Sequence, residues 1–330
     1  MNVMLLAAGR STRLGTLGLS LPKPLVPVCG YPAIQYGLAA CARAGLPAAV
    51  VNLFHHGDRI RAALGDGMSL GVNLRYSVEI DLLGTGGGIA KARPLFSPGP
   101  VLVMNAKVVA DIDLRALIAA HAVSGAQATM VLRDDPDPRR WGAIGVDATG
   151  RVVSILEHRS PLPPEGPVTE RMFTGIHIIE PPLLDRLSPQ PCDVIREAYI
   201  PALTAGARIM ATTLTGYFAE HSTPDRYLAG NLTLLGQPSL LPSPPGPLVG
   251  VDPQSSIDAN AVIIPPCRIQ AGAAIEAGAH VGPGVVIGHG ARVMPGVHLT
   301  RSVVWPGVTV TSSAEDTVFT PDGIVKIPAA

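Results

Sequence analysis

Aliphatic residues recur at every sixth position near the end of this 330-residue chain, and this period is the feature that most restricts its fold. The repeated residues are Ile257, Ile263, Ile269, Ile275, Val281, Ile287, Val293 and Leu299. Small or compact residues follow four places later, at Ala261, Cys267, Ala273, Ala279, Val285, Ala291 and Val297. A hexapeptide period is typical of a parallel β-helix, in which the aliphatic side chain points inward and the small residue lets the chain turn. Three faces per coil predict about three coils.

The chain before the repeat shows a different pattern, in which apolar strands alternate with helical segments. We expect strands at 2–8, 47–53, 72–77, 100–104, 126–133 and 208–214, and helices at 31–45, 55–64, 111–124, 193–203 and 224–235. Such alternation predicts a doubly wound, mostly parallel α/β sheet. The proline-rich segment 237–249 is a plausible linker. We therefore expect one domain at 1–236 and the β-helix with its tail at 250–330.

The loop after the first strand carries the residues that best suit an anionic ligand. Ala7, Ala8 and Gly9 are small and are expected to leave backbone N–H groups exposed for an anion. Arg13 and Lys23 are spaced to flank a polyphosphate lying over this loop. The loop is not a Walker A loop, because no GK[ST] sequence closes it. The alternative is a solvated surface loop.

Composition excludes several kinds of partner. The 25 basic and 25 acidic residues balance, so no broad attraction to nucleic acid or to a membrane surface is implied. No apolar run approaches the ~18 residues of a membrane span, and the chain enters a strand without a signal peptide. The four cysteines are scattered without metal-binding spacing, which points to a reducing cytosol. We expect a cytoplasmic protein with small-molecule substrates.

The first two dozen residues resemble the signature of the sugar-1-phosphate nucleotidyltransferases, also called nucleoside-diphosphate-sugar pyrophosphorylases. That signature runs LAAG-x-G-T-R-L and then PKPL-P-V, and this chain has LAAGRSTRL at 6–14 and PKPLVPV at 22–28. The resemblance implies a Rossmann-like domain followed by a left-handed β-helix. It also implies transfer of a nucleotidyl group from a nucleoside triphosphate to a sugar 1-phosphate, with release of pyrophosphate. Leu6 and the residues 7–9 would contact the nucleotide, Arg13 the leaving phosphates and Lys23 the sugar phosphate.

Further short stretches resemble elements that contact the nucleotide and the sugar in this family. The glycine-rich stretch at 81–88 resembles the element around the nucleobase and ribose, which implies roles for Gly84 and Thr85. The resemblance implies sugar contacts for Asn105, Gly142, Glu157 and Gly175. Each short match has a structural alternative, such as a glycine in a bend or a glutamate on a solvated strand face.

The metal site of the family is altered in this chain. The family has N-G-D where this chain reads Asn105-Ala106-Lys107, and the missing aspartate holds the catalytic Mg²⁺. A lysine ammonium has no lone pair, so it cannot ligate Mg²⁺, but it can place a positive charge near the α-phosphate. Glu220 stands where the second metal carboxylate is found. Lys107 could thus lock a bound nucleotide, replace the metal as a cation, or leave Mg²⁺ to Glu220 and the triphosphate.

Three functions fit these features. We expect a nucleotidyltransferase, either of the GDP-mannose type or one that makes a UDP-linked amino sugar or muramate. The alternative is a non-catalytic regulatory subunit that binds a nucleotide sugar, because the family contains such members. A third possibility is a hexapeptide acyltransferase, for which His280 and His298 would stack one coil apart on one face. A solvated histidine column is the competing interpretation of that pair.

The end of the β-helix suggests how the protein assembles. We expect Val303, Val304 and Trp305 to be exposed and to contact either another subunit or the first domain. This predicts a homodimer or a larger homo-oligomer.

Overall fold

The computed structural model describes residues 1–9, 12–19 and 21–328 and divides the chain into two compact units. The first unit comprises residues 1–9, 40–106 and 112–216. The second comprises residues 10–39, 107–111 and 217–330. The chain therefore passes between the units at several points, and the domain boundaries at 236 and 249 stay a prediction.

The first unit is built on a sheet whose centre is parallel, in the order β5-β4-β1-β6. These strands are β1 (Asn2–Leu6), β4 (Ala48–Leu53), β5 (Asn73–Val78) and β6 (Val101–Asn105). Strand β12 (Thr169–Ile179) pairs antiparallel with β6 and continues the sheet. The remaining strands are β8 (Ala128–Arg133), β9 (Ile144–Val146), β10 (Val152–Ile155), β11 (His158–Arg159) and β13 (Ile209–Thr213). Met4, Val50 and Val103 are buried in its core, as expected for parallel strands covered on both faces.

The helices follow the predicted pattern with small differences. The α-helices are α1 (Ala33–Ala44), α2 (Gly57–Leu64), α3 (Gly84–Ala92), α4 (Leu114–Ser124), α5 (Pro181–Leu184), α6 (Ile200–Thr204) and α7 (Pro224–Gly236). The predicted helix at 193–203 is divided into a π-helical turn, Ile195–Tyr199, and α6. Pro201 explains the division, because it has no N–H group for a regular helical hydrogen bond. In the described part of the chain, no helix combines the length and apolar character needed to span a bilayer.

Shorter elements complete the chain. The 3₁₀ helices are η1 (Thr12–Gly18), η2 (Lys23–Leu25), η3 (Met68–Leu70), η4 (Arg93–Leu95), η5 (Pro138–Trp141) and η7 (Pro238–Leu240). Two small antiparallel pairs belong to the second unit, β2 (Pro27–Val28) with β3 (Tyr31–Pro32) and β7 (Val108–Ala110) with β14 (Phe218–Glu220). The second of these pairs matters for the site, because it brings residues 107 and 220 together.

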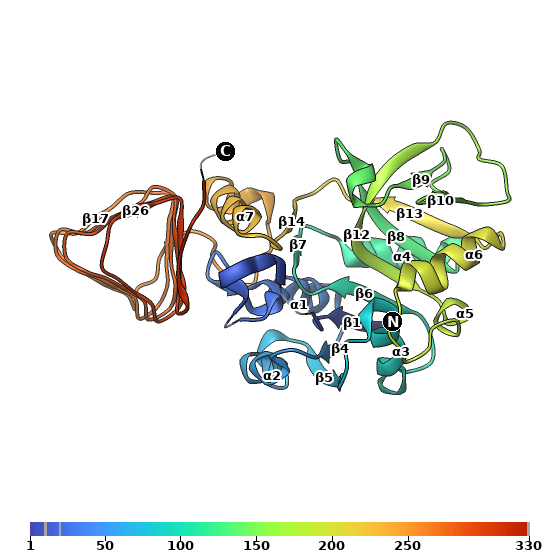
Figure 1. The fold of residues 1–330 in the computed structure, drawn as a ribbon, viewed down its shortest axis with the longest axis horizontal. Helices are drawn as coiled ribbons and strands as arrows, with labels where there is room; N and C mark the ends of the chain where they lie inside the picture. The colour runs from blue at the N-terminus through green and yellow to red at the C-terminus, as the bar shows by residue number, and fades with distance from the viewer. Residues whose placement is uncertain (10–11, 20, 329–330) are drawn as a thin grey trace. The chain divides into compact units, whose positions relative to one another are not determined.

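The second unit ends in a parallel β-helix, which has a triangular outline in Figure 1 (orange to red). One sheet contains β15 (Gly250–Val251), β18 (Cys267–Ile269), β21 (Val285–Ile287), β24 (Val303–Val304), β27 (Thr317–Thr320) and β28 (Gly323–Lys326). The second contains β16 (Ser256–Ile257), β19 (Ala274–Ile275), β22 (Arg292–Val293) and β25 (Thr309–Val310). The third contains β17 (Val262–Ile263), β20 (His280–Val281), β23 (His298–Thr300) and β26 (Ala314–Glu315).

The strand register confirms the hexapeptide period. Ile275 lies between Ile257 and Val293 in neighbouring coils, so one coil advances 18 residues (275 − 257), or three hexads. Strands β15 to β26 make four complete coils in the described part of the chain. The predicted number of about three was therefore too low, because pairing also includes Gly250–Val251 before the regular repeat and residues 303–315 after it.

The end of the β-helix is buried rather than exposed. Val303, Val304 and Trp305 are at most 1% exposed, so the prediction of an exposed apolar patch was wrong. Val304 faces the interior of the β-helix, whereas Val303 and Trp305 face outward and join a second core with Tyr227 of α7. Tyr227 lies within residues 1–236, so the alternative prediction, contact with the predicted first domain, is confirmed. Val304 and its two neighbours belong to different cores because successive side chains in a strand point to opposite faces.

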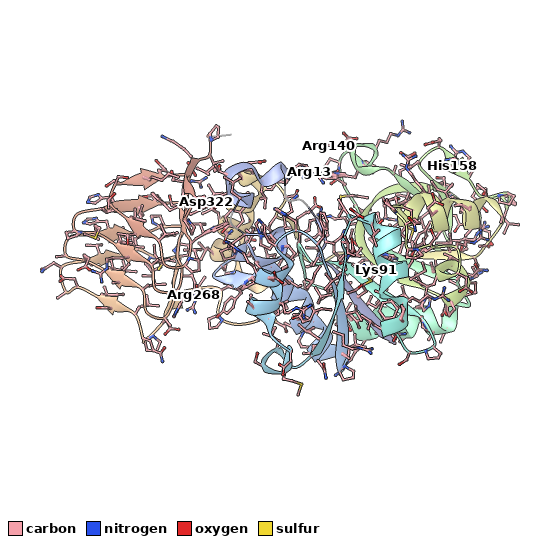
Figure 2. All side chains as sticks on the ribbon, turned by 60° about the horizontal axis from the view of Figure 1, so that its bottom comes forward. Arg13, Lys91, Arg140, His158, Arg268 and Asp322 are labelled. Carbon is pink, nitrogen blue, oxygen red and sulfur yellow. The ribbon has the colours of Figure 1, made fainter. Side chains whose placement is uncertain are left out.

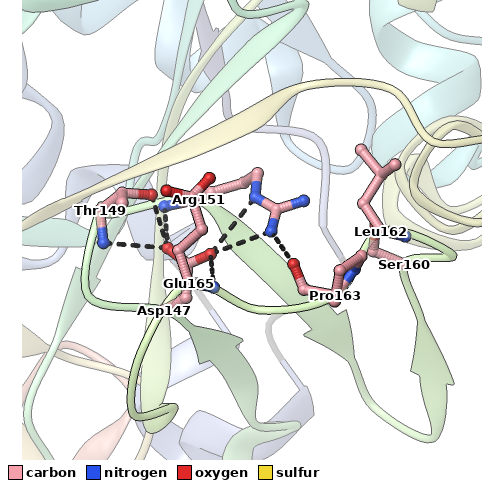
Figure 3. A network of polar contacts seen from close by, with 7 residues as sticks. All are labelled: Asp147, Thr149, Arg151, Ser160, Leu162, Pro163 and Glu165. Atoms are coloured by element: carbon pink, nitrogen blue, oxygen red, sulfur yellow. Dashed lines mark hydrogen bonds and ion pairs between the residues drawn. The ribbon is translucent and has the colours of Figure 1, made fainter.

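A buried ion pair anchors the loop that follows β11 in the first unit (Figure 3). The Asp147 carboxylate accepts hydrogen bonds from the backbone N–H groups of Thr149, Arg151 and Glu165. The Arg151 guanidinium donates to the same carboxylate at 3.1 Å and also to the Pro163 carbonyl. Burial raises the pKa of Asp147, but the hydrogen bond from the Thr149 hydroxyl and those from the three backbone N–H groups outweigh it and lower the pKa to about 2.

We expect Asp147→Asn to destabilise the protein by about 3 kcal/mol at pH 7, because Arg151 would lose a buried counter-charge. The folded-state pKa of Asp147 is depressed, so its contribution is complete above the unfolded pKa near 4. The contribution is lost as the pH falls toward 2. Urea denaturation at pH 7 and pH 3 measures both effects. Glu170→Gln, which breaks the exposed pair with Arg139, is the control and should lower the free energy of unfolding by under ~1 kcal/mol. Equal decreases in the free energy of unfolding of the two variants would contradict this account.

Candidate active site

The loop after β1 begins with an amide that is already hydrogen-bonded. The Ala7 N–H group donates to Asn52 Oδ1 at 2.7 Å, and the Ala8 N–H group lies 3.4 Å from the same oxygen. The prediction that the Ala7 N–H group is exposed for an anion was therefore wrong, because this group donates its hydrogen bond to Asn52 near the end of β4. The Leu6 carbonyl accepts from the Ala106 N–H group at 3.1 Å. Gly9 has open surroundings, since a Cβ added there would meet no atom within 4 Å.

A buried polar network holds this loop, and the sequence analysis did not identify it. Asn52 Nδ2 donates to Glu79 Oε1 at 2.7 Å, and the Leu83 N–H group donates to Glu79 Oε2 at 3.0 Å. Asn52 is 2% exposed and Glu79 is 4% exposed. Asn52 lies near the carboxyl end of a parallel strand and Glu79 follows the next one, where ligand sites gather in such sheets. That location is the signal in the sequence that could have indicated both residues.

The glycine-rich start of α3 serves the packing of the first unit. A Cβ on Gly88 would lie 2.8 Å from both Asn52 Nδ2 and Glu79 Oε1, so only glycine fits beside this network. Gly84 has a φ of +70°, and a Cβ there would lie 2.6 Å from the Cys192 carbonyl oxygen. Thr85 Oγ1 donates to Asp193 Oδ2 at 3.1 Å. The nucleotide contacts of Gly84 and Thr85 stay a prediction.

The predicted sugar-binding residues form two separate pairs in the described contacts. Asn105 ends β6, and a Cβ on Gly175 would lie 2.0 Å from Asn105 Nδ2, so these two residues touch. Gly175 has a φ of +77° and lies at an irregularity in the pairing of β12 with β8. A Cβ on Gly142 would lie 2.9 Å from Leu156, the residue before Glu157. The Glu157 carboxylate is exposed and lies 3.4 Å from the His158 imidazole, labelled in Figure 2.

Lys107 and Glu220 form an ion pair in the second unit. Glu220 in β14 pairs with Val108 in β7, which places Lys107 beside it. Lys107 Nζ contacts Glu220 Oε1 directly, and both side chains are about one-fifth exposed. Ser222 Oγ donates to Glu220 Oε2 at 3.1 Å, and Arg226 Nη1 lies 3.9 Å from the same oxygen. Burial raises the pKa of Glu220, but Lys107 and Ser222 outweigh it and hold the pKa below its ordinary value.

Lys23 and Arg13 belong to the same electrostatic cluster. Burial lowers the pKa of Lys23 to about 8, and the nearby charges of Lys107 and Arg13 contribute to this lowering, whereas Glu220 raises it. Arg13 is exposed on η1 (Figure 2). A titratable group perturbed by burial and by specific neighbouring charges marks a candidate functional site. Electrostatic coupling thus links Arg13, Lys23, Lys107 and Glu220, and their catalytic roles stay a prediction.

The residues of this cluster do not fit a Mg²⁺ ion. Mg²⁺ needs oxygen ligands in near-octahedral geometry, and Glu220 is the carboxylate of the cluster. Lys107 already neutralises it, and Arg13, Lys23 and Arg226 add further positive charge. Among residues 1–9, 12–19 and 21–328, no group of three His, Cys, Asp or Glu side chains is placed to hold a metal ion. The cluster is suited to phosphate groups instead, which prefer lysine and arginine.

The histidine pair of the β-helix has the predicted arrangement. His280 and His298 are partners in neighbouring coils, and their rings stack with centroids 4.2 Å apart and planes 14° apart. Their positions on β20 and β23 follow from the 18-residue coil (298 − 280). The acyltransferase and the solvated column both stay predictions for this pair.

A family model and several known proteins are similar to this chain. Residues 2–217 match the family model described as "Nucleotidyl transferase". The mannose-1-phosphate guanylyltransferase of Mycobacterium tuberculosis is 31% identical over 246 residues, covering 74% of this chain and 66% of the relative. The mannose-1-phosphate guanyltransferase of Schizosaccharomyces pombe is 32% identical over 271 residues, covering 79% of this chain and 74% of the relative. The chain thus spans about two thirds to three quarters of these relatives.

A solved structure shares the fold. HddC from Yersinia pseudotuberculosis, crystallised with GMP-PN, superimposes with a TM-score of 0.58 at 20% sequence identity. The match covers 71% of this chain and 99% of that protein.

Proposed function

This chain belongs to the nucleotidyl transferase family, and we propose that it joins a nucleoside triphosphate to a sugar 1-phosphate, releasing pyrophosphate. The observation that carries this proposal is the cluster of Arg13, Lys23 and Lys107 around the carboxylate of Glu220. These residues come from separate segments of the chain, and their combined charge suits two phosphorylated substrates better than a neutral ligand.

The chemistry requires alignment and charge neutralisation rather than a general base. A phosphate oxygen of the sugar 1-phosphate attacks the α-phosphorus, a new P–O bond forms, and the bond to the β-phosphate oxygen breaks. The nucleophile is already ionised, so no proton has to be removed. We assign Arg13 to the leaving pyrophosphate and Lys23 to the sugar phosphate, each by charge-assisted hydrogen bonds. Leu6 to Gly9, Gly84 and Thr85 would contact the nucleotide, and Asn105, Gly142, Glu157 and Gly175 the sugar.

Lys107 is proposed to replace the metal ion on which this family generally depends. Its ammonium can neutralise charge on the α-phosphate without a coordination shell, and Glu220 keeps it oriented. The cost of such a replacement is that a point charge cannot bridge several phosphate oxygens as a metal does.

The relatives favour GTP and mannose 1-phosphate as substrates. The named relatives are mannose-1-phosphate guanylyltransferases from a bacterium and a yeast, and a further one is the catalytic subunit beta from Drosophila melanogaster, 29% identical over 271 residues. A UDP-linked amino sugar is the other candidate product. The altered metal position favours a second function, a regulatory subunit that binds the nucleotide sugar without making it.

We expect pyrophosphate release when GTP and mannose 1-phosphate are supplied together, with smaller or no release from other pairs. The assay crosses GTP, UTP, ATP, CTP and dTTP with mannose, glucose and N-acetylglucosamine 1-phosphates, and ³¹P NMR identifies the diphosphate-linked product. Omitting the sugar phosphate is the control for contaminating phosphatases. If no pair reacts while GDP-mannose raises the melting temperature, the regulatory function is the better description.

Assembly and location extend the proposal. We propose a homo-oligomer, which light scattering can test, although the face expected to join subunits is used inside one chain. A cytoplasmic location rests on the scattered cysteines.

A further inference from the structure

A chain of buried hydrogen bonds runs from the β-helix to Pro27, four residues after Lys23. We propose that Trp305 and Tyr227 are positioning residues for Lys23, so that the β-helix is part of the catalytic apparatus rather than only a docking module. The inference rests on the proposed function for its catalytic meaning. The contacts themselves lie entirely within the second unit.

The relay has two links. Trp305 Nε1–H donates to the Tyr227 hydroxyl at 3.0 Å, and that hydroxyl donates to the Pro27 carbonyl at 2.6 Å. Tyr227 is 0% exposed and Trp305 is 1% exposed, and their rings meet edge to face with centroids 6.3 Å apart. Because both groups are shielded from water, neither the indole N–H nor the Pro27 carbonyl has solvent as a substitute partner.

Further side chains hold the residues just after Pro27. The Cys29 N–H group donates to Asn231 Oδ1 at 2.7 Å, and Asn231 Nδ2 donates to the Tyr227 carbonyl at 2.8 Å. From the β-helix, Gln270 Nε2 donates to the Gly30 carbonyl at 2.9 Å. Side chains of α7 and of the β-helix thus form hydrogen bonds with the main chain at Pro27, Cys29 and Gly30.

A short, conformationally restricted segment connects Pro27 to Lys23. The Val26 N–H group donates to the Lys23 carbonyl at 3.3 Å, and the Leu25 N–H group donates to the Pro22 carbonyl at 2.8 Å. Leu25 and Val26 are buried, and the prolines at 24 and 27 restrict φ. A shift of the Pro27 carbonyl is therefore transmitted to the Lys23 backbone instead of being absorbed by a flexible loop.

Because other charged groups surround Lys23, the position of its ammonium affects its electrostatic energy. Its ammonium is half-buried and is coupled electrostatically to Lys107, Arg13 and Glu220, and the energy between charges depends on their separation. Charged groups that stabilise a transition state also act only within a narrow range of geometry, since misplacement by 1 Å can lower a rate about 10²-fold.

The test uses Tyr227→Phe, which removes only the hydroxyl, and Trp305→Phe, which removes the N–H group together with the five-membered ring of the indole. Tyr199→Phe is the matched control, because its fully buried hydroxyl contacts His177 Nδ1 at 2.6 Å in the first unit. Competitive acetylation of Lys23 across the pH range, followed by mass spectrometry, measures the titration of Lys23 without requiring turnover. Steady-state kinetics then give kcat and KM for both substrates.

We expect Tyr227→Phe to lower kcat about tenfold and to change KM for the triphosphate far less. Trp305→Phe should have a smaller effect of the same kind. Both variants should shift the midpoint of Lys23 acetylation, whereas Tyr199→Phe should not. Equal kcat and an unchanged Lys23 titration in folded Tyr227→Phe protein would overturn the proposal. If the wild type has no turnover, the proposed function fails, and the acetylation midpoint still decides whether the relay positions Lys23.

Discussion

Replacing Lys23 with alanine is expected to lower kcat/KM on the order of 10³-fold, the range found when one group aimed at developing charge is removed. The half-buried ammonium lies among cations, so an arriving phosphate relieves repulsion as well as gaining a hydrogen bond. Lys326→Ala, an exposed lysine on β28, is the control and should leave the rate unchanged. Initial rates at subsaturating substrate measure both variants.

The pH dependence separates loss of charge from loss of structure. The pKa of Lys23 is lowered to about 8, so its charged form is populated below that pH and is lost above it. We therefore expect kcat/KM of the wild type to fall above pH 8, and kcat to fall at higher pH, because bound phosphate favours the ammonium. The melting temperature of Lys23→Ala at pH 7 should not decrease, since burial and neighbouring cations disfavour the charged lysine. A variant that keeps more than about one tenth of wild-type activity would contradict the assigned role.

Removing divalent metal ions with a chelator is expected to leave wild-type turnover largely intact, because Lys107 already supplies the charge paired with Glu220. Lys107→Met, which keeps most of the side-chain volume, should then lower kcat on the order of 10³-fold. Lys107→Asp should make turnover depend on Mg²⁺, since two carboxylates would face each other at residues 107 and 220. Pyrophosphate release with and without chelator measures all three proteins.

Two outcomes of this experiment would change the conclusion. Chelator-sensitive wild type, restored by added Mg²⁺, would mean that Glu220 and the triphosphate hold a metal ion despite Lys107. Inactive wild type with Mg²⁺-dependent Lys107→Asp would mean that the natural protein is a regulatory subunit. In that case the ion pair would be the change that ended catalysis.

Features that depend on local order along the chain could be predicted from sequence. The β-helix followed from a six-residue period, because each hexad places one aliphatic side chain inward whatever the rest of the molecule does. The parallel sheet followed from apolar segments alternating with helical ones. The loop with Arg13 and Lys23 was predicted from its place after the first strand and from its resemblance to the family, and the roles of both residues stay a prediction.

Features that depend on pairing between distant segments were decided only by the tertiary structure. The sequence shows opposite charges at Lys107 and Glu220, but only the pairing of β7 with β14 brings these side chains together as an ion pair. By residue type, nothing in the sequence marks Asn52 and Glu79 as special polar residues. The parallel pairing of β4 with β5 brings them together, and Asn52 then accepts a hydrogen bond from the first loop. Trp305 was expected to be exposed and to contact another subunit or the first domain, and it is buried against Tyr227, 78 residues away. The residue period along the sequence determines toward which face of a strand a side chain points. The tertiary fold determines which other residues pack against that face.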